Sequence, residues 1–227
     1  MKAVIPAKNS STRVPGKNFR PFYKDLSLFD IKILQLLDHF AADDIYVSSE
    51  DASIARNAAR WKVNFLERDP ILARNETPYA AVVSEICRGV PGDDDLAWCH
   101  VTDPLFDEYG ACVEQWSAAR AEHDSLVVVY PMKVYLLDED HRPMGFGFGP
   151  WHTPSQRLPV RYQLGFTLSL LRRDTATALG PIGANPSWFH AGNRTVDIDD
   201  LADFRQAQAI YRVLREGLPE VNDETAP

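Results

Sequence analysis

Short apolar runs alternate along the first 130 residues with segments in which apolar side chains recur every three or four positions. The runs are typical of buried strands, and the longer spacing is typical of amphipathic helices. The expected strands cover residues 4–5, 45–47, 63–66, 96–101 and 126–130, and the expected helices cover 28–40, 51–61, 79–88 and 107–121. Because strands that alternate with helices of about ten residues form βαβ units, this pattern predicts an α/β fold with a mostly parallel sheet.

The alternation stops at residues 131–163, which carry five prolines and the run Gly145-Phe146-Gly147-Phe148-Gly149. Such a stretch inside a compact domain is usually a functional loop, a lid or an oligomer contact. The pattern then resumes, and the remaining expected elements are strands at 164–171 and 195–198 and a helix at 201–214. No repeat or linker divides the sequence, which predicts a single domain over 1–227 with a frayed tail at 218–227.

The composition is that of an ordinary soluble globular protein, with 45% hydrophobic and 25% charged residues. No apolar run approaches the roughly 20 residues needed to span a bilayer, and the N-terminus resembles a buried strand more than a signal peptide. Cys87, Cys99 and Cys112 lack metal-type spacing, and their odd number argues against a disulfide framework. These features predict a cytoplasmic protein. The formal net charge of −8 argues against binding to nucleic acid or to a membrane surface.

Basic residues are concentrated near the N-terminus. The first 24 residues hold six basic and no acidic side chains, whereas the rest of the chain holds 18 basic and 32 acidic ones. The loop after the first expected strand contributes Lys8, Arg13 and Lys17, with hydroxyl side chains between them. Because α/β sheets bind ligands at the carboxyl ends of parallel strands, this loop predicts a site for a small anion such as a triphosphate. The alternative is a solvated basic loop, and the spacing is not that of a Walker motif.

Two acidic residues near the C-terminus form a candidate metal site. Asp197 and Asp199 lie two positions apart at the last expected strand, so they would project from the same face. Neighbouring carboxylates repel each other unless a cation lies between them, and Mg²⁺ prefers such oxygen ligands. The alternative is an aspartate cap for the helix that follows, a role that Asp200 could also fill.

The start of the chain is similar to that of a known family. Ile5-Pro6-Ala7-Lys8, then Ser11, then Pro15-Gly16-Lys17-Asn18 resembles the N-terminal motif of the CMP-sialic acid synthetases (acylneuraminate cytidylyltransferases) and related CMP-sugar-acid synthetases. The resemblance implies a three-layer, Rossmann-like nucleotidyltransferase fold with a mostly parallel sheet, and the use of CTP and magnesium. Together with the basic loop, it gives these candidate nucleotide-binding residues: Ala7, Lys8, Ser11, Arg13, Lys17, Asn18, Arg68 and Thr102.

Three further segments match the family in the same order along the chain, namely 45–55, 65–73 and 196–204. Arg68 corresponds to an arginine that contributes to nucleotide binding, and its alternative is a surface arginine in a turn. The resemblance gives Asp197 and Asp199 magnesium-binding roles. The candidate catalytic residues are Lys8, Lys17 and Asp199.

The segment from His100 to Phe106 stands where the family has Gln-Pro-Thr-Ser-Pro-Leu-Arg. Asp103 replaces the serine, and synthetases for the eight-carbon sugar acid Kdo have a metal-binding aspartate close to this position. Asp103 is therefore a third metal candidate. Phe106 replaces an arginine associated with the acidic sugar, which argues against sialic acid itself. The family's acceptor region corresponds to the candidates Gln156, Arg157, Arg161 and Tyr162, although the two arginines could instead face solvent.

These observations predict a cytidylyltransferase that transfers CMP from CTP to a sialic-acid-like or Kdo-like sugar acid and releases pyrophosphate. A phosphonate acceptor is an alternative, as are a nucleotide-sugar glycosyltransferase and a non-catalytic ligand-binding homologue. Family members are dimers whose arms cross in the region of 131–163, so the resemblance implies a homodimer with this excursion as its dimerisation arm. The alternative is that its apolar residues fold back onto their own sheet.

Overall fold

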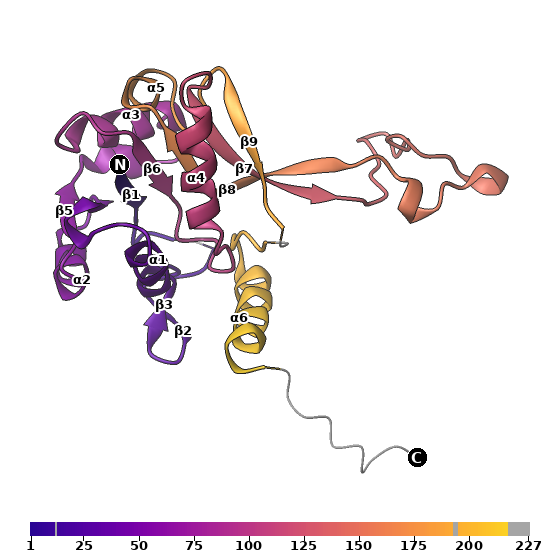
Figure 1. The fold of residues 1–227 in the computed structure, drawn as a ribbon. Helices are drawn as coiled ribbons and strands as arrows, with labels where there is room; N and C mark the ends of the chain where they lie inside the picture. The colour runs from indigo at the N-terminus through magenta and orange to yellow at the C-terminus, as the bar shows by residue number, and fades with distance from the viewer. Residues whose placement is uncertain (12, 193–194, 218–227) are drawn as a thin grey trace, which may run out of the picture.

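Seven strands form one central sheet in the computed structural model, which describes residues 1–11, 13–192 and 195–217 (Figure 1). Their order across the sheet is β5-β4-β1-β6-β8-β7-β9. The strands are β1 (Lys2–Pro6), β4 (Ile45–Ser49), β5 (Asn64–Glu67), β6 (Leu96–Cys99), β7 (Ser125–Met132), β8 (Arg161–Leu171) and β9 (Pro186–His190). All except β9 overlap a strand expected from the sequence. The tail at 218–227, expected to fray, lies outside the described residues.

The sheet is mostly parallel, as the alternating pattern predicts. β1 runs parallel to β4 and β6, β4 to β5, and β7 to β9, whereas β8 is antiparallel to both β6 and β7. Parallel strands are covered by helices on both faces and therefore consist of buried apolar residues. In β1, the side chains of Ala3, Val4 and Ile5 are all completely buried.

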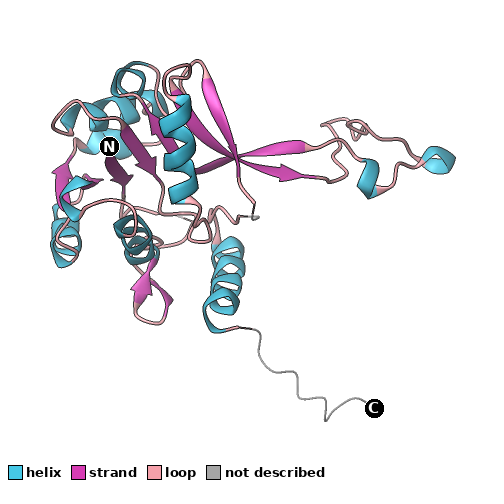
Figure 2. Cartoon of the chain, in the orientation of Figure 1, coloured by secondary structure: helices cyan, strands magenta, loops and turns pink. Residues whose placement is uncertain are grey.

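Helices cover both faces of the sheet and complete the three layers (Figure 2). One face packs against α1 (Leu28–Leu37), α2 (Ala55–Arg60) and α4 (Tyr109–Ala119), and the other against α3 (Tyr79–Gly89) and α5 (Arg173–Ala178). α1 begins at a capping box, in which the side chains of Ser27 and Asp30 each accept the other's backbone N–H. The fold class expected from the sequence is confirmed. Within the described residues, no helix has the length and apolar character needed to cross a membrane.

A third apolar cluster joins the beginning of the chain to its end. The hairpin of β2 (Pro21–Tyr23) and β3 (Leu26–Ser27) packs against α6 (Leu201–Glu216). The rings of Phe22 and Phe204 meet edge to face, with 5.2 Å between their centroids. This packing brings the loop after β1 next to the segment that precedes α6.

The C-terminal part of the chain differs from expectation. The strand predicted at 195–198 is wrong, because these residues form none. Instead Ile198 donates its N–H to the Thr102 carbonyl (3.0 Å) and buries its side chain completely in the third cluster. The last strand is β9, which pairs with the edge strand β7, and neither β9 nor α5 was predicted. Asp197 and Asp199 therefore owe their positions to the packing of Ile198 between them, not to a shared strand face.

The excursion between β7 and β8 projects from the body as an arm (Figure 1). The two strands continue as a paired ribbon that carries residues 133–160. Side chains of the arm pack on one another, and Tyr135 stacks on His152 with 5.3 Å between the ring centroids. Trp151 is 81% exposed. The excursion predicted at 131–163 thus does not fold back onto its own sheet, and its role in dimerisation stays a prediction.

Candidate active site

A cavity of about 650 Å³ opens at the carboxyl ends of β1 and β6. This is the edge at which parallel α/β sheets bind ligands. Its walls come from the loop after β1, from residues between Arg68 and Tyr79, from the end of β6 and from the segment before α6. The residues predicted from sequence that line it are Lys8, Ser11, Arg13, Lys17, Asn18, Arg68, Thr102 and Asp199.

Ala7, which was predicted to bind the nucleotide, lies beneath the cavity and not on its wall. It is completely buried, and its N–H donates to the Ser48 carbonyl (2.9 Å). Its backbone donor is therefore already used to join β1 to β4.

The turn after β4 holds two walls of the cavity in place. Glu50 Oε2 accepts hydrogen bonds from Nε and Nη2 of Arg68, at 3.1 and 2.7 Å. Asp51 Oδ2 accepts one from the side-chain amide of Asn9, at 3.1 Å. Arg68 is only 8% exposed and lines the cavity, so it is not the surface turn residue of the alternative interpretation.

Lys17 connects the loop after β1 to the acidic segment before α6. Its buried ammonium group donates to the Ile198 carbonyl. Burial lowers the pKa of Lys17, while the carboxylates of Asp199 and Asp197 oppose that shift. Lys17 therefore balances the charge of the acidic segment and fixes its distance from the basic loop.

Arg13 makes a second link between the same two segments. Its Nη2 lies 2.8 Å from Asp199 Oδ1, and the two side chains are 63% and 58% exposed. Ion pairs in such solvated positions contribute at most about 1 kcal/mol to stability. A ligand can therefore replace either partner at little cost.

Asp197 is the more buried of the two principal metal candidates. Burial is the largest cause that raises its pKa, the charges of Asp199 and Asp103 raise it further, and the Thr102 hydroxyl and Lys17 lower it. Neighbouring carboxylate oxygens suit Mg²⁺. In the part of the chain that the structure describes, however, no three acidic, histidine or cysteine side chains are grouped so that they could hold a metal ion. A cation at this position would therefore need oxygen atoms from the ligand as well.

Asp200, and not Asp197 or Asp199, caps α6. The Asp200 side chain accepts the backbone N–H groups of Ala202 and Asp203, at 2.7 and 3.0 Å. The Asp203 carboxylate in turn accepts the N–H of Asp200 at 3.0 Å. The cap does not use the other two carboxylates, so they remain candidates for a cation.

Asn18 lines the cavity and has a buried acceptor without a partner among the described residues. Its Nδ2 donates to the Lys8 carbonyl (3.0 Å), and the residue is only 6% exposed. Among the described residues, no donor reaches its buried Oδ1. Because a buried acceptor without a donor costs about 1–3 kcal/mol, this atom favours a ligand that brings an N–H or O–H group.

An aromatic cluster on another wall was missed by sequence reasoning. Trp98 Nε1 donates to the Tyr79 hydroxyl oxygen (2.8 Å) and to His100 Nε2 (3.0 Å), and these two atoms lie 2.6 Å apart. Since an indole N–H can only donate, His100 Nε2 must be unprotonated. Burial lowers the pKa of His100 to about 4, which agrees with a neutral ring. Nothing in the sequence links Tyr79 to His100, because their contact depends on how α3 packs on β6.

Solved structures of other proteins share this fold. A CMP:2-keto-3-deoxy-manno-octonic acid synthetase complexed with CTP matches with a TM-score of 0.67 and 12% identity, over 92% of this chain and 97% of that chain. A 4-diphosphocytidyl-2C-methyl-D-erythritol synthase from Anaerococcus prevotii matches with a TM-score of 0.62 and 11% identity, over 93% and 97%. HddC from Yersinia pseudotuberculosis matches with a TM-score of 0.58 and 13% identity, over 92% and 99%. The chain has the α/β nucleotidyltransferase fold. No family model matches it, and no curated protein does.

The candidate acceptor residues expected from the sequence lie on the arm or at its base. Arg161 donates from Nη2 to the Met144 carbonyl (3.2 Å), and Tyr162 stacks on His190 with 4.8 Å between the ring centroids. None of the acceptor candidates lines the cavity of its own chain, and neither do the metal candidates Asp103 and Asp197; the acceptor candidates are Gln156, Arg157, Arg161 and Tyr162.

Proposed function

We propose that this protein is a cytidylyltransferase, which transfers CMP from CTP to an acidic small molecule and releases pyrophosphate. The observation that carries the proposal is the cavity at the carboxyl edge of the sheet, where Lys8, Arg13 and Lys17 face the segment of Asp197 and Asp199. Cations and carboxylates on one cavity suit a triphosphate with a divalent metal. Cytidine as the base is supported by the similar fold of the synthetase that was solved with CTP.

In the proposed reaction, an oxygen atom of the acceptor attacks the α-phosphorus of CTP. The bond from the α-phosphorus to the oxygen that bridges to the β-phosphorus breaks, and pyrophosphate leaves with that oxygen. The enzyme forms no covalent intermediate, so positioning and charge stabilisation supply most of the acceleration. A magnesium ion held by Asp197 and Asp199 would neutralise the charge that develops on pyrophosphate.

The residues of the cavity have separate tasks in this proposal. Lys8 and Lys17 bind the β- and γ-phosphates, and Arg13 joins them when it leaves Asp199. Lys17 does so from the position in which it holds the Ile198 carbonyl, so it also keeps the basic loop and the acidic segment at a fixed distance. The unpaired Oδ1 of Asn18 accepts a hydrogen bond from the nucleoside.

The acceptor is proposed to be a sialic-acid-like or Kdo-like sugar acid, or else a phosphonate. Phe106 cannot contribute to its binding, because it is only 3% exposed and packs edge to face on Tyr109. Arg157 and Arg161 on the arm supply the charge that an acidic group requires. Since the arm projects away from its own body, we propose a homodimer in which these arginines serve the cavity of the second copy.

Pyrophosphate release tests the proposal. The protein would be incubated with CTP, Mg²⁺ and a panel of sialic, Kdo-like, pseudaminic-like and phosphonic acids. The expected result is release that requires CTP together with one class of acid. Hydrolysis of a CDP- or UDP-sugar without pyrophosphate release would indicate a glycosyltransferase, and CTP binding without turnover would indicate a non-catalytic protein.

A further inference from the structure

Lys32, in the middle of α1, is a buried lysine to which the proposed reaction gives no role. The residue is completely buried, and its ammonium group donates to the Asp103 carbonyl (3.1 Å) and to the Tyr109 hydroxyl. Moving an ammonium group out of water costs several kcal/mol. A methionine would fill similar space without that cost, so packing alone does not explain the charge at this position.

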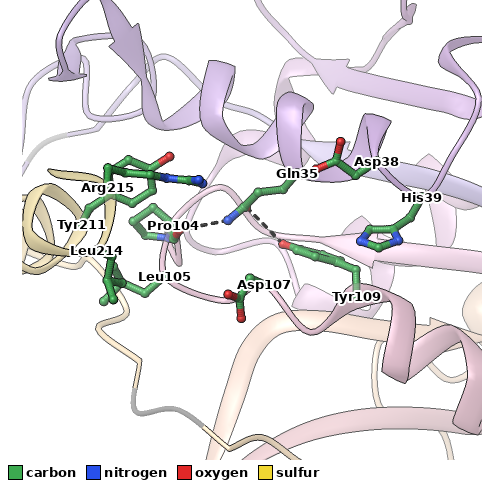
Figure 3. Close-up of a pocket in the computed structure, with 10 residues that line it drawn as sticks. All are labelled: Gln35, Asp38, His39, Pro104, Leu105, Asp107, Tyr109, Tyr211, Leu214 and Arg215. Carbon is green, nitrogen blue, oxygen red and sulfur yellow. Dashed lines mark hydrogen bonds between the residues drawn. The ribbon is translucent and has the colours of Figure 1, made fainter. Parts of the chain in front are cut away.

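The backbone that follows β6 is held by α1 through side-chain hydrogen bonds. Besides the bond from Lys32, Gln35 donates from Nε2 to the carbonyls of Pro104 (2.9 Å) and Phe106 (2.8 Å). The Tyr109 hydroxyl lies 3.4 Å from Gln35 Oε1. Figure 3 shows the Gln35 side chain reaching toward Pro104 and Tyr109, and all three residues line a second cavity. The hydrogen bonds therefore fix the segment after β6 against α1.

The Asp103 carboxylate is fixed as firmly as its backbone. Asp103 is only 2% exposed. Its Oδ2 accepts a hydrogen bond from the Tyr130 hydroxyl (2.8 Å), and its Oδ1 accepts one from the Leu105 N–H (3.2 Å). A carboxylate with this many donors has little freedom to reorient.

The position of this segment determines that of the acidic residues before α6. The Thr102 carbonyl accepts the Ile198 N–H at 3.0 Å, and the Thr102 side chain reaches Asp197. The charge of Asp103 also acts on Asp197. A shift of the backbone at Asp103 would therefore move the Asp197 carboxylate relative to its neighbours.

We propose that Lys32 is a positioning residue for the divalent cation: by fixing the backbone at Asp103, it holds the neighbouring Thr102 in place and, through the bond from Ile198 to Thr102, the carboxylates of Asp197 and Asp199 that bind the metal. This inference rests on the proposed function. Lys32 itself touches neither the nucleotide nor the metal. The positive charge of Lys32 by itself would repel a cation, so its removal would strengthen metal binding if only electrostatics mattered. If Lys32 acts by positioning, removal of the charge and its hydrogen bonds weakens metal binding.

The test is the affinity of the full-length protein for Mn²⁺ in the presence of CTP. Free Mn²⁺ would be followed by electron paramagnetic resonance, with protein in excess over CTP. Lys32→Met keeps the length of the side chain and removes its charge and donors. The expected result is an affinity lower by about 10- to 100-fold, as is typical when a group that orients metal ligands is removed. Unchanged or tighter Mn²⁺ binding would overturn the inference.

Gln35→Met is the matched control, because it removes the bonds from α1 to Pro104 and Phe106 and the long contact with the Tyr109 hydroxyl, but leaves the bonds from Lys32 to Asp103 and Tyr109 in place. Its Mn²⁺ affinity should stay close to that of the wild type. An equal loss in both variants would mean general loosening and would overturn the inference. If circular dichroism shows that Lys32→Met does not fold, Tyr109→Phe replaces it, with a smaller loss expected and unchanged affinity as the contrary result. A wild-type protein that binds neither CTP nor Mn²⁺ would refute the proposed function itself.

Discussion

Arg13 Nη2 lies 2.8 Å from Asp199 Oδ1, and this ion pair joins residues that are 186 positions apart in the sequence. Both partners are exposed candidates for ligand binding, one for phosphate and one for a cation. Because the pair is solvated and weak, the phosphates of CTP can take Arg13 while a cation takes Asp199. We expect the pair to open when the metal–nucleotide complex binds.

Replacing Arg13 should weaken CTP binding and leave the free energy of unfolding nearly unchanged. Arg13→Gln removes a charge-assisted phosphate contact, so CTP affinity should fall by about 10- to 150-fold. The free energy of unfolding should change by less than about 1 kcal/mol, since the pair is exposed. Calorimetric titration with CTP and urea denaturation measure the two quantities. Unchanged CTP affinity with a large loss of stability would make the pair structural.

Asp199→Asn should leave the fold intact and remove most of the turnover, because a neutral amide is a poor ligand for magnesium. We expect pyrophosphate release to fall by about 100-fold or more at saturating Mg²⁺, as on removal of a strong electrostatic stabiliser. Asp200→Asn is the control, since asparagine also caps helices and Asp200 serves only as the cap of α6. Near-normal rates for Asp199→Asn would show that the metal site is assigned to the wrong residues.

Phe106→Arg should not create an arginine that can bind an acidic sugar, although the synthetases that the sequence resembles have an arginine at the corresponding position. The Phe106 ring is buried against Tyr109, so an arginine there would place an unpaired charge in the core. We expect a loss of about 3 kcal/mol or more in the free energy of unfolding, measured by urea denaturation. Phe106→Leu, which stays apolar, should lose less. Wild-type stability together with new activity toward sialic acid would contradict this placement of residue 106.

The main elements of the fold could be predicted because their patterns are local. One such pattern is the apolar run Ala3-Val4-Ile5, which is typical of a strand buried on both faces. Another is the capping box of Ser27 and Asp30, which lies within four residues of sequence. β9 (Pro186–His190) could not be recognised in the same way. Its sequence has only two adjacent large apolar residues, and it becomes a strand through its pairing with β7.

The sequence indicates a candidate site only where residue type alone suggests chemistry. The basic loop and the paired aspartates are such cases, and the structure places Lys8, Lys17 and Asp199 on one cavity although the expected strand was wrong; their functions stay predictions. The hydrogen bonds of Lys32 and of His100 join them to Asp103 and Tyr79, which come from other elements. A sequence pattern does not contain contacts of this kind.

The arm should be required for assembly and for acceptor binding but not for CTP binding. Its exposed aromatic residues, among them Trp151, have no partner to cover them in the described single chain. Deleting residues 138–149 and joining the ends with a short Gly-Ser turn should convert a dimer into a monomer, as measured by light scattering. That monomer should keep its affinity for CTP and lose affinity for the acidic substrate. A monomeric wild-type protein at micromolar concentration would refute the proposed dimer.

The most direct measurement of the central claim follows the α-phosphate of CTP. The protein would receive CTP labelled with ³²P at the α-position, Mg²⁺ and the panel of acids, and the products would be separated by thin-layer chromatography. We predict that the label moves into a new compound that contains the acid, that the same reaction with γ-labelled CTP yields labelled pyrophosphate, and that Asp199→Asn abolishes both. If the α-label stays in CTP with every acid, or appears only as free CMP, the protein does not transfer cytidylyl groups to such acceptors.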